Sequence, residues 1–159
     1  MATIEEIYAY LTKKGVEHNF YVVAEFCASP NNSLFEKNID LVWLSKRDCA
    51  DTERIGSLRE WKIEAAFEIE GYDVPLDRIR IHSEQFNVLR NEERVKFPCY
   101  VPLYTEALHR SDPEWGTDKP QGKITSKIAQ RQDKAKEIGC VIKVCDCRTW
   151  DWVDSVLEK

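Results

Sequence analysis

Apolar residues recur in the first part of the chain with the period of a helix. The spacing predicts a helix over residues 3–14. The buried face of this helix would carry Ile4, Ile7, Tyr8 and Leu11. Thr3 and Glu6 form a T-x-x-E capping box, in which each side chain bonds the backbone N–H of the other residue. Gly15 is expected to end the helix, because glycine is common just after the last helical residue.

Three apolar segments then show the composition and period of strands. They run over Asn19–Cys27, Asn38–Leu44 and Trp61–Glu70. The second is apolar almost throughout, apart from Asp40, as expected of a strand covered on both faces. The third alternates apolar and polar residues, so Glu68 and Glu70 are predicted to point to the same face of a sheet.

The second half of the chain alternates helices and strands. Helices are predicted over Asp77–Glu93, Lys123–Ile138 and Trp152–Leu157, and strands over Phe97–Tyr104 and Cys140–Cys145. Because Pro98 and Pro102 cannot donate to a ladder, their segment is expected to be an edge strand or a short irregular one. The complete order, αβββ followed by α, β, α, β, α, predicts an α/β fold with a mixed sheet flanked by helices.

Composition favours one folded unit. Of 159 residues, 43% are hydrophobic and 32% are charged, which excludes a disordered chain and suits a single domain over 1–159. The longest apolar runs are far shorter than the roughly 20 residues that a membrane crossing needs. The segment Met1–Leu11 has neither the basic start nor the apolar core of a secretory signal. We therefore expect a cytoplasmic protein with no membrane partner.

The six cysteines do not require disulfides, because a chain of this length can fold without them, and reduced thiols are expected. Cys145 and Cys147 form a C-x-C pair beside Cys140. A structural zinc site normally takes two such pairs with short spacing. Buried small hydrophobic side chains are therefore the favoured interpretation, and zinc is the alternative.

Three carboxylates interrupt segments that are predicted to be buried strands. They are Asp40 in IDLVW, and Glu68 and Glu70 in FEIE. Burying a charge is costly unless a partner compensates it, and Mg²⁺ is commonly held by one or two carboxylates with waters and substrate phosphates. These acids therefore favour a divalent cation site. The alternative is a solvated strand face on which Glu64, Glu68 and Glu70 lie by chance.

The segment IDLVW, a loop, an apolar strand ending in AAFEIE and a helix together resemble the D…(D/E)-x-K core of PD-(D/E)XK, or restriction-endonuclease-like, nucleases. The resemblance covers residues 20–95. It implies a restriction-endonuclease-like αβββαβ core in which Asp40 and Glu68 ligate Mg²⁺ or Mn²⁺, helped by the main-chain carbonyl of Ile69.

The resemblance also has departures. Glu70 stands where the family has lysine, and Ile39 stands where the name motif has proline. Glu70 would then be a third catalytic residue, as a general base for the attacking water or as a ligand of a second metal. Glu25 would correspond to the additional acidic metal ligand that many members contribute from the N-terminal part of the fold, with Glu5 or Glu6 as alternatives.

Basic residues offer two candidate contacts to nucleic acid, although the net charge of −5 opposes nonspecific attraction to it. One helix face would carry Lys123, Lys127, Arg131 and Lys134, at spacings of four, four and three. A phosphate backbone could lie along this stripe, and the alternative is an ordinary solvated face. Arg78, Arg80 and Arg90, in the segment after FEIE, are the second set.

These features lead to one functional hypothesis and two rivals. The hypothesis is a Mg²⁺- or Mn²⁺-dependent endonuclease that hydrolyses phosphodiester bonds in DNA. At this length, sequence specificity would require a homodimer or a protein partner. The first rival is a noncatalytic module of the same fold that binds a protein or nucleic acid. The second, an acidic inhibitor that mimics DNA, follows from the net charge alone.

Overall fold

The computed structural model describes residues 2–26, 38–46, 61–93, 97–106, 121–138 and 142–157. The helices are α1 (Ile4–Glu17), α2 (Leu76–Glu93), α3 (Gln121–Glu137) and α4 (Asp151–Leu157). The strands are β1 (Tyr21–Phe26), β2 (Ile39–Lys46), β3 (Trp61–Phe67), β4 (Glu70–Gly71), β5 (Cys99–Tyr104) and β6 (Ile142–Asp146). The predicted order of helices and strands is confirmed, with the two-residue β4 as an addition.

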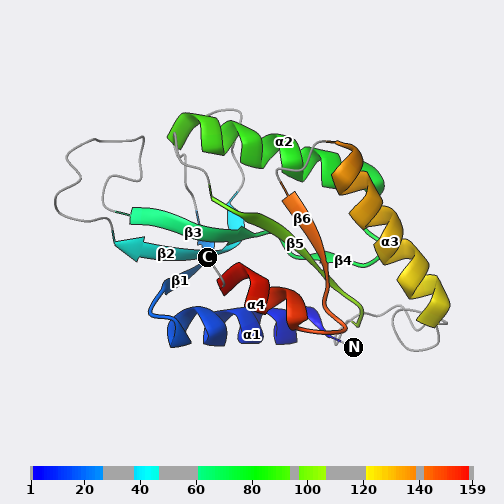
Figure 1. Ribbon diagram of the computed structural model, residues 1–159, viewed down its shortest axis with the longest axis horizontal. Coiled ribbons are helices and arrows are strands. Elements are labelled where there is room, and N and C mark those ends of the chain that lie inside the picture. The colour runs from blue at the N-terminus through cyan, green and yellow to red at the C-terminus, as the bar shows by residue number, and fades with distance from the viewer. Residues whose placement is uncertain are drawn as a thin grey trace.

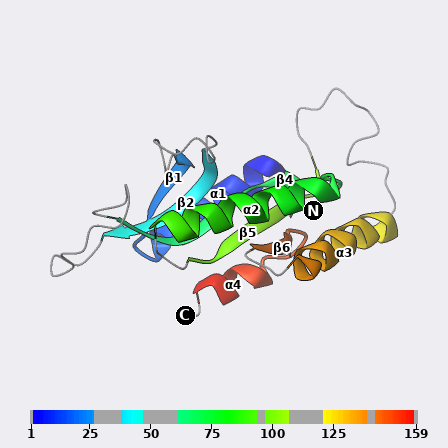
Figure 2. The same cartoon turned by 90° about the horizontal axis from the view of Figure 1, so that it is seen from above.

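These elements form three layers, with one mixed sheet between two pairs of helices (Figure 1). α2 and α3 cover one face of the sheet, and α1 and α4 cover the other (Figures 1 and 2). β1, β2 and β3 are antiparallel neighbours. β5 runs parallel to β3 and β4 on one side and to β6 on the other. The fold is therefore α/β with a mixed sheet flanked by helices, as predicted.

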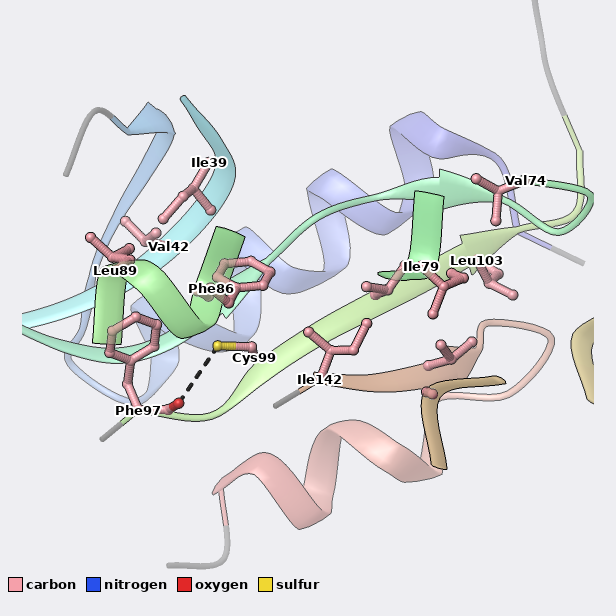
Figure 3. Packing of buried hydrophobic residues seen from close by; sticks show 14 of the residues in the cluster. Ile39, Val42, Val74, Ile79, Phe86, Leu89, Phe97, Cys99, Leu103 and Ile142 are labelled. Carbon is pink, nitrogen blue, oxygen red and sulfur yellow. Dashed lines mark hydrogen bonds between the residues drawn. The ribbon is translucent and has the colours of Figure 1, made fainter. Parts of the chain in front are cut away.

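Two hydrophobic clusters fill the spaces between the layers. In the first, Ile79, Phe86 and Leu89 of α2 point toward the apolar side chains of the strands (Figure 3). The second joins α1 and α4 to the opposite face, and its centre is the edge-to-face pair of Trp43 and Phe67, with ring centroids 5.0 Å apart. Because both faces are covered, β2 is apolar almost throughout.

Helix α1 continues beyond Gly15 to Glu17, so the prediction that Gly15 ends the helix is wrong. Gly15 is buried against the sheet, where an added Cβ would lie 2.6 Å from Nε1 of Trp43 and 2.6 Å from Val22. The indole Nε1 of Trp43 also donates a hydrogen bond to the carbonyl of Leu11 at 3.0 Å. Glycine is therefore needed for close helix packing rather than for a cap.

The third strand is shorter than predicted, because β3 ends at Phe67 and Glu70 belongs to β4. The prediction of an edge strand at Phe97–Tyr104 is also wrong, since β5 lies inside the sheet. Ala66, Glu68 and Tyr72 donate backbone hydrogen bonds to carbonyls on one side of this segment, those of Pro98, just before β5, and of Tyr100 and Tyr104 within it. Pro102 lies on this same side of β5, opposite the interval between β3 and β4, where its missing N–H is tolerated.

The described cysteines, Cys99, Cys145 and Cys147, are free and buried, as expected of reduced thiols that pack as small hydrophobes. Burial raises the pKa of the Cys99 thiol to about 12. Cys140, the third cysteine of the alternative zinc site, lies outside the described residues. Over the described ranges, the helices are all too short or too polar to cross a membrane.

Candidate active site

Three acids lie next to one another across three neighbouring segments, on β1, on β2 and directly after β3. Leu41 of β2 pairs with Phe67 of β3, so Asp40 and Glu68, one position further along, lie opposite each other. On the other side of β2, Ala24 of β1 pairs with Leu41 and Phe26 pairs with Ile39. Glu25, between them, therefore lies opposite Asp40. Antiparallel pairing thus puts the three residues that the sequence predicts as metal ligands at neighbouring register positions.

Asp40 and Glu68 lie where the ladder between β2 and β3 opens. Oδ2 of Asp40 accepts a hydrogen bond from the N–H of Ile69 at 2.9 Å. The N–H of Glu68 donates to the carbonyl of Tyr100 at 3.0 Å. These bonds fix the backbone between β3 and β4, and Glu68 remains only 5% exposed there. The protein therefore holds a buried acid beside a half-buried one, and the charges of both act on the guanidinium of Arg78.

The charges of these acids affect the pKa of Tyr8 on α1. Burial raises the pKa of the Tyr8 hydroxyl far above its usual value, and the negative charges of Asp40, Glu25 and Glu68 raise it further. The hydroxyl therefore stays protonated at neutral pH and can donate a hydrogen bond. The sequence predicted Tyr8 only as part of the buried face of the helix and did not indicate that it lies near the acids.

Glu25 combines charge with an unusual backbone. Its φ is 53°, in the left-handed region that residues other than glycine rarely adopt. Such a conformation costs roughly 1–2 kcal/mol for a residue with a Cβ. Glu25 is exposed, whereas Glu68 is buried. The backbone of β1 is thus distorted next to Asp40.

Glu70 accepts hydrogen bonds from two side chains of α2, those of Arg78 and His82. Its Oε1 accepts hydrogen bonds from Nη2 of Arg78 at 2.9 Å and from Nε2 of His82 at 2.8 Å. Partial burial raises the pKa of Glu70, but the hydrogen bonds from His82 and Arg78 outweigh it, and the pKa lies below its usual value. Glu70 is therefore a stable anion and a weak base, which disfavours its predicted role as the general base.

Arg78 links Glu70 to the other acids. The hydrogen bond and charge of Glu70 raise the pKa of the Arg78 guanidinium, and the charges of Glu68 and Asp40 raise it further. Arg78 and Glu70 also line an open pocket of about 460 Å³, together with Gly71, Asp73, Val74, Pro75 and Tyr104. The pocket therefore has two acids, Glu70 and Asp73, in its lining beside Arg78.

The chemistry of the described acids leaves one binding mode open for Mg²⁺ or Mn²⁺. Among the described residues, no three His, Cys, Asp or Glu side chains are arranged around a common point as metal ligands. A three-ligand site of Asp40, Glu68 and Glu25 is therefore not assembled in the described residues. The hard oxygens of Asp40 and Glu68 suit the alternative mode, in which two carboxylates hold the cation and waters and substrate phosphates complete its shell.

The basic stripe of α3 is interrupted. Lys123 is exposed, and Lys127 and Lys134 are half-buried. Arg131 is only 8% exposed, and its guanidinium donates to the carbonyls of Val74 and Lys127 at 2.9 and 3.1 Å and to Gln130 Oε1 at 3.1 Å. The expectation that Arg131 lies on an exposed stripe is wrong, because these hydrogen bonds bind its guanidinium inside the protein.

The sequence interpretation missed the roles of Arg78 and His82. Arg78 was one of three arginines considered for substrate contact, but Arg80 pairs instead with Asp77 and Glu84 on its own helix. The spacing of four between Arg78 and His82 puts both on one face of α2, and that pattern could have indicated a shared partner. Its identity, Glu70, depends on how α2 docks on the sheet.

Comparison of the chain with known protein families, with curated protein sequences and with solved structures found no match.

Proposed function

We propose that this protein is a Mg²⁺- or Mn²⁺-dependent endonuclease that hydrolyses phosphodiester bonds in DNA, with Asp40 and Glu68 as the metal ligands. The observation that carries the proposal is the register between β2 and β3, which puts these carboxylates opposite each other at the point where the strands separate. Glu68 is buried there, and the oxygens of its carboxylate and of Asp40 are of the kind that a hard divalent cation prefers.

The order of the elements supports the same proposal. An antiparallel β1–β2–β3 meander follows α1, and α2 then leads to β5, which is parallel to β3. This order agrees with the αβββαβ core that the resemblance to restriction-endonuclease-like nucleases implies. The acids lie on β2 and directly after β3, the two strands that would carry the metal ligands in such a core.

A divalent cation at this site would supply electrostatic stabilisation of the phosphate charge and would increase the acidity of the attacking water. The side chains of the protein have separate tasks. Asp40 and Glu68 hold the cation, while the low pKa of Glu70 suits it to position a neighbour rather than to remove a proton. The protonated Tyr8 hydroxyl is available as a hydrogen-bond donor near the acids.

The test is cleavage of supercoiled plasmid and of single-stranded DNA in Mg²⁺ or Mn²⁺. Asp40→Asn and Glu68→Gln keep the size of each side chain and remove its charge. Glu64→Gln is the matched control, because Glu64 lies on β3 and is hydrogen-bonded to Ser45 away from the site. Changing even an outer-shell partner of a metal costs about 10–100-fold, so each ligand variant should lose at least about 100-fold in activity.

A specific observation favours a second candidate, a noncatalytic module of the same fold. The described residues hold no assembled group of three metal-ligating side chains, and Glu70, which replaces the family's lysine, is a weak base. Absence of cleavage by the wild-type protein, together with absence of Mn²⁺ binding, would reject the nuclease and favour this module. Cleavage that survives in both ligand variants would reject the assigned site.

A further inference from the structure

Two side chains on one face of α2 share a single acceptor oxygen. Arg78 and His82 are four residues apart, and both donate to Oε1 of Glu70. The exposed fraction of the three side chains falls from 41% for Arg78 to 19% for Glu70 and 1% for His82. The cluster therefore runs from a buried imidazole, through a carboxylate, to a guanidinium at the surface.

The guanidinium of Arg78 has N–H groups that remain available as hydrogen-bond donors to a ligand. It carries five N–H groups, and among the described residues the one side-chain hydrogen bond found for it runs from Nη2 to Glu70. Arg131, by contrast, already donates three. Because Arg78 lines the 460 Å³ pocket beside the acids, its remaining donors can meet a ligand there.

We propose that Arg78 binds the phosphate of the substrate, and that Glu70 and His82 are positioning residues that hold its guanidinium beside the metal site. This inference rests on the proposed function. A planar guanidinium matches the oxygens of a phosphate in a two-point contact, and a single anchored orientation reduces the entropy lost on binding. Glu70 thus serves the site through Arg78 and does not bind the metal.

The charges around Arg78 make this binding conditional. Glu70 and Asp73 line the same pocket, and Asp40 and Glu68 lie close by. Against these four acids, Arg78 and the charge of Arg131, which acts on Asp73, still leave the site negative, so it repels a phosphate when the protein is alone. A divalent cation on Asp40 and Glu68 reverses this balance. Phosphate binding at Arg78 therefore depends on the metal.

His82 is the least exposed member of the cluster and has an unexplained polar atom. Its Nε2 supplies the proton of the bond to Glu70, because a carboxylate can only accept. No hydrogen-bond partner is found for the buried Nδ1 within the described residues. A buried polar atom of this kind lowers stability, and sites that retain one often have a functional reason. The position of Glu70, and through it that of Arg78, is that reason.

The experiment measures binding rather than turnover. Isothermal titration calorimetry would record Mn²⁺ binding first, and then the affinity for inorganic phosphate with and without Mn²⁺. Arg78→Met is compared with Arg80→Met, since Arg80 lies on the same helix but pairs with Asp77 and Glu84. Circular dichroism spectra would establish that each variant is folded.

Arg78→Met is expected to bind Mn²⁺ at least as tightly as the wild type does, because a positive charge near the metal ligands is removed, and to lose roughly 10- to 100-fold in phosphate affinity, the range for charge-assisted hydrogen bonds. Arg80→Met should leave both affinities unchanged. Equal phosphate affinity in the wild type and Arg78→Met, with Mn²⁺ bound, would overturn the inference alone. A wild type that binds no Mn²⁺ would overturn the proposed function, and the inference with it.

The positioning role has its own variants. His82→Gln can keep a donor near Glu70, whereas His82→Leu cannot. If His82 acts through Arg78, His82→Leu should weaken phosphate binding in Mn²⁺ without changing Mn²⁺ affinity, and His82→Gln should restore part of the loss. A purely structural role predicts equal phosphate affinity in folded His82→Leu and wild type, and that result would overturn the assignment.

Discussion

Two arginines on adjacent helices occupy opposite environments. Arg131 of α3 is 8% exposed and donates three hydrogen bonds to groups of the protein, including the carbonyl of Val74 just before α2. Arg78 of α2 is 41% exposed and anchored by one bond to Glu70. Burial lowers the pKa of Arg131, while the hydrogen bond to Glu70 raises that of Arg78.

The difference between the two environments shows which cationic side chains remain available to bind a ligand. On the sequence, Arg131 looked like part of an exposed basic stripe, and Arg78 was one of three arginines in a charged segment. In the fold, the donors of Arg131 connect α3 to the start of α2, so the side chain acts as a structural crosslink. The donors of Arg78 remain largely unused beside four acids. The position of an arginine in a pattern of charges therefore predicts less about ligand binding than the number of its hydrogen-bond donors that already bind groups of the protein.

The largest effect on stability is expected for Arg131→Met. The methionine retains apolar contact but leaves the carbonyl of Val74, a buried residue, without its donor. An unsatisfied buried group of this kind costs about 1–3 kcal/mol, and the loss of the other two bonds adds to it. We expect a decrease of about 3 kcal/mol in the free energy of unfolding, measured by urea denaturation, with unchanged Mn²⁺ affinity.

Arg131→Lys is the control for charge. A lysine keeps the positive charge but cannot reproduce the fork of a guanidinium, so it should recover less than half of the loss. Full recovery in Arg131→Lys would show that charge, rather than the hydrogen bonds to the backbone, is what α3 contributes at this position. The comparison with Arg78 would then lose its physical basis.

The sequence was most informative where local pattern decides the structure. Hydrophobic period and strand-like composition predicted the order of elements, and the charges of Asp40 and Glu68 within apolar segments indicated the candidate site. Two predictions failed because a distant neighbour decides the outcome. Gly15 remains inside α1 because Trp43 packs against it, and Pro102 is tolerated in β5 because the adjacent strand is interrupted.

The charged side chains could not be interpreted in the same way. Which donor meets Glu70 depends on how α2 docks on the sheet, and period alone does not determine that arrangement. The same limit explains Arg131, whose main acceptor, Val74, is 57 residues away in the chain. Patterns of charge thus located the charged residues along the chain but did not identify their hydrogen-bond partners.

An intermediate case, Arg148, gives a pH-dependent prediction. Arg148 donates from Nε and Nη2 to the carboxylate of Asp146, and from Nη1 to Thr125. Burial raises the pKa of Asp146, but the hydrogen bonds and charge of Arg148 outweigh it, and the pKa lies below its ordinary value of 3.8. Asp146→Asn should lower the free energy of unfolding by about 1–2 kcal/mol at pH 7.

The sign of the pH dependence follows from the lowered pKa. The charged carboxylate stabilises the fold fully above the pKa of the unfolded state, and this contribution is lost as the pH falls through the folded-state pKa. The difference between wild type and Asp146→Asn should therefore be constant from pH 7 to pH 5 and decline below about pH 4. A difference that persists undiminished at pH 2.5, in urea titrations of both proteins, would contradict the ion pair.

A smaller effect is expected at Lys127, the half-buried lysine of the stripe. Its Nζ lies 5.8 Å from the centroid of the Tyr72 ring, within the range of a cation–π contact. Lys127→Met should cost about 0.5–1 kcal/mol. Lys127→Arg, which retains the cation, should cost less. Equal stability of Lys127→Met and wild type would leave Lys127 as free as Lys123 to contact a nucleic acid.

The smallest effect on stability is expected for Arg78→Met. The Arg78 side chain is 41% exposed, so solvent screens its bond to Glu70, and Glu70 retains His82 as a second donor. The free energy of unfolding should change by at most about 0.5 kcal/mol. Urea denaturation of Arg78→Met beside Arg131→Met would measure the contrast. A loss as large as that of Arg131→Met would mean that both arginines are crosslinks, whereas a small loss leaves Arg78 with donors that folding does not need and a phosphate can use.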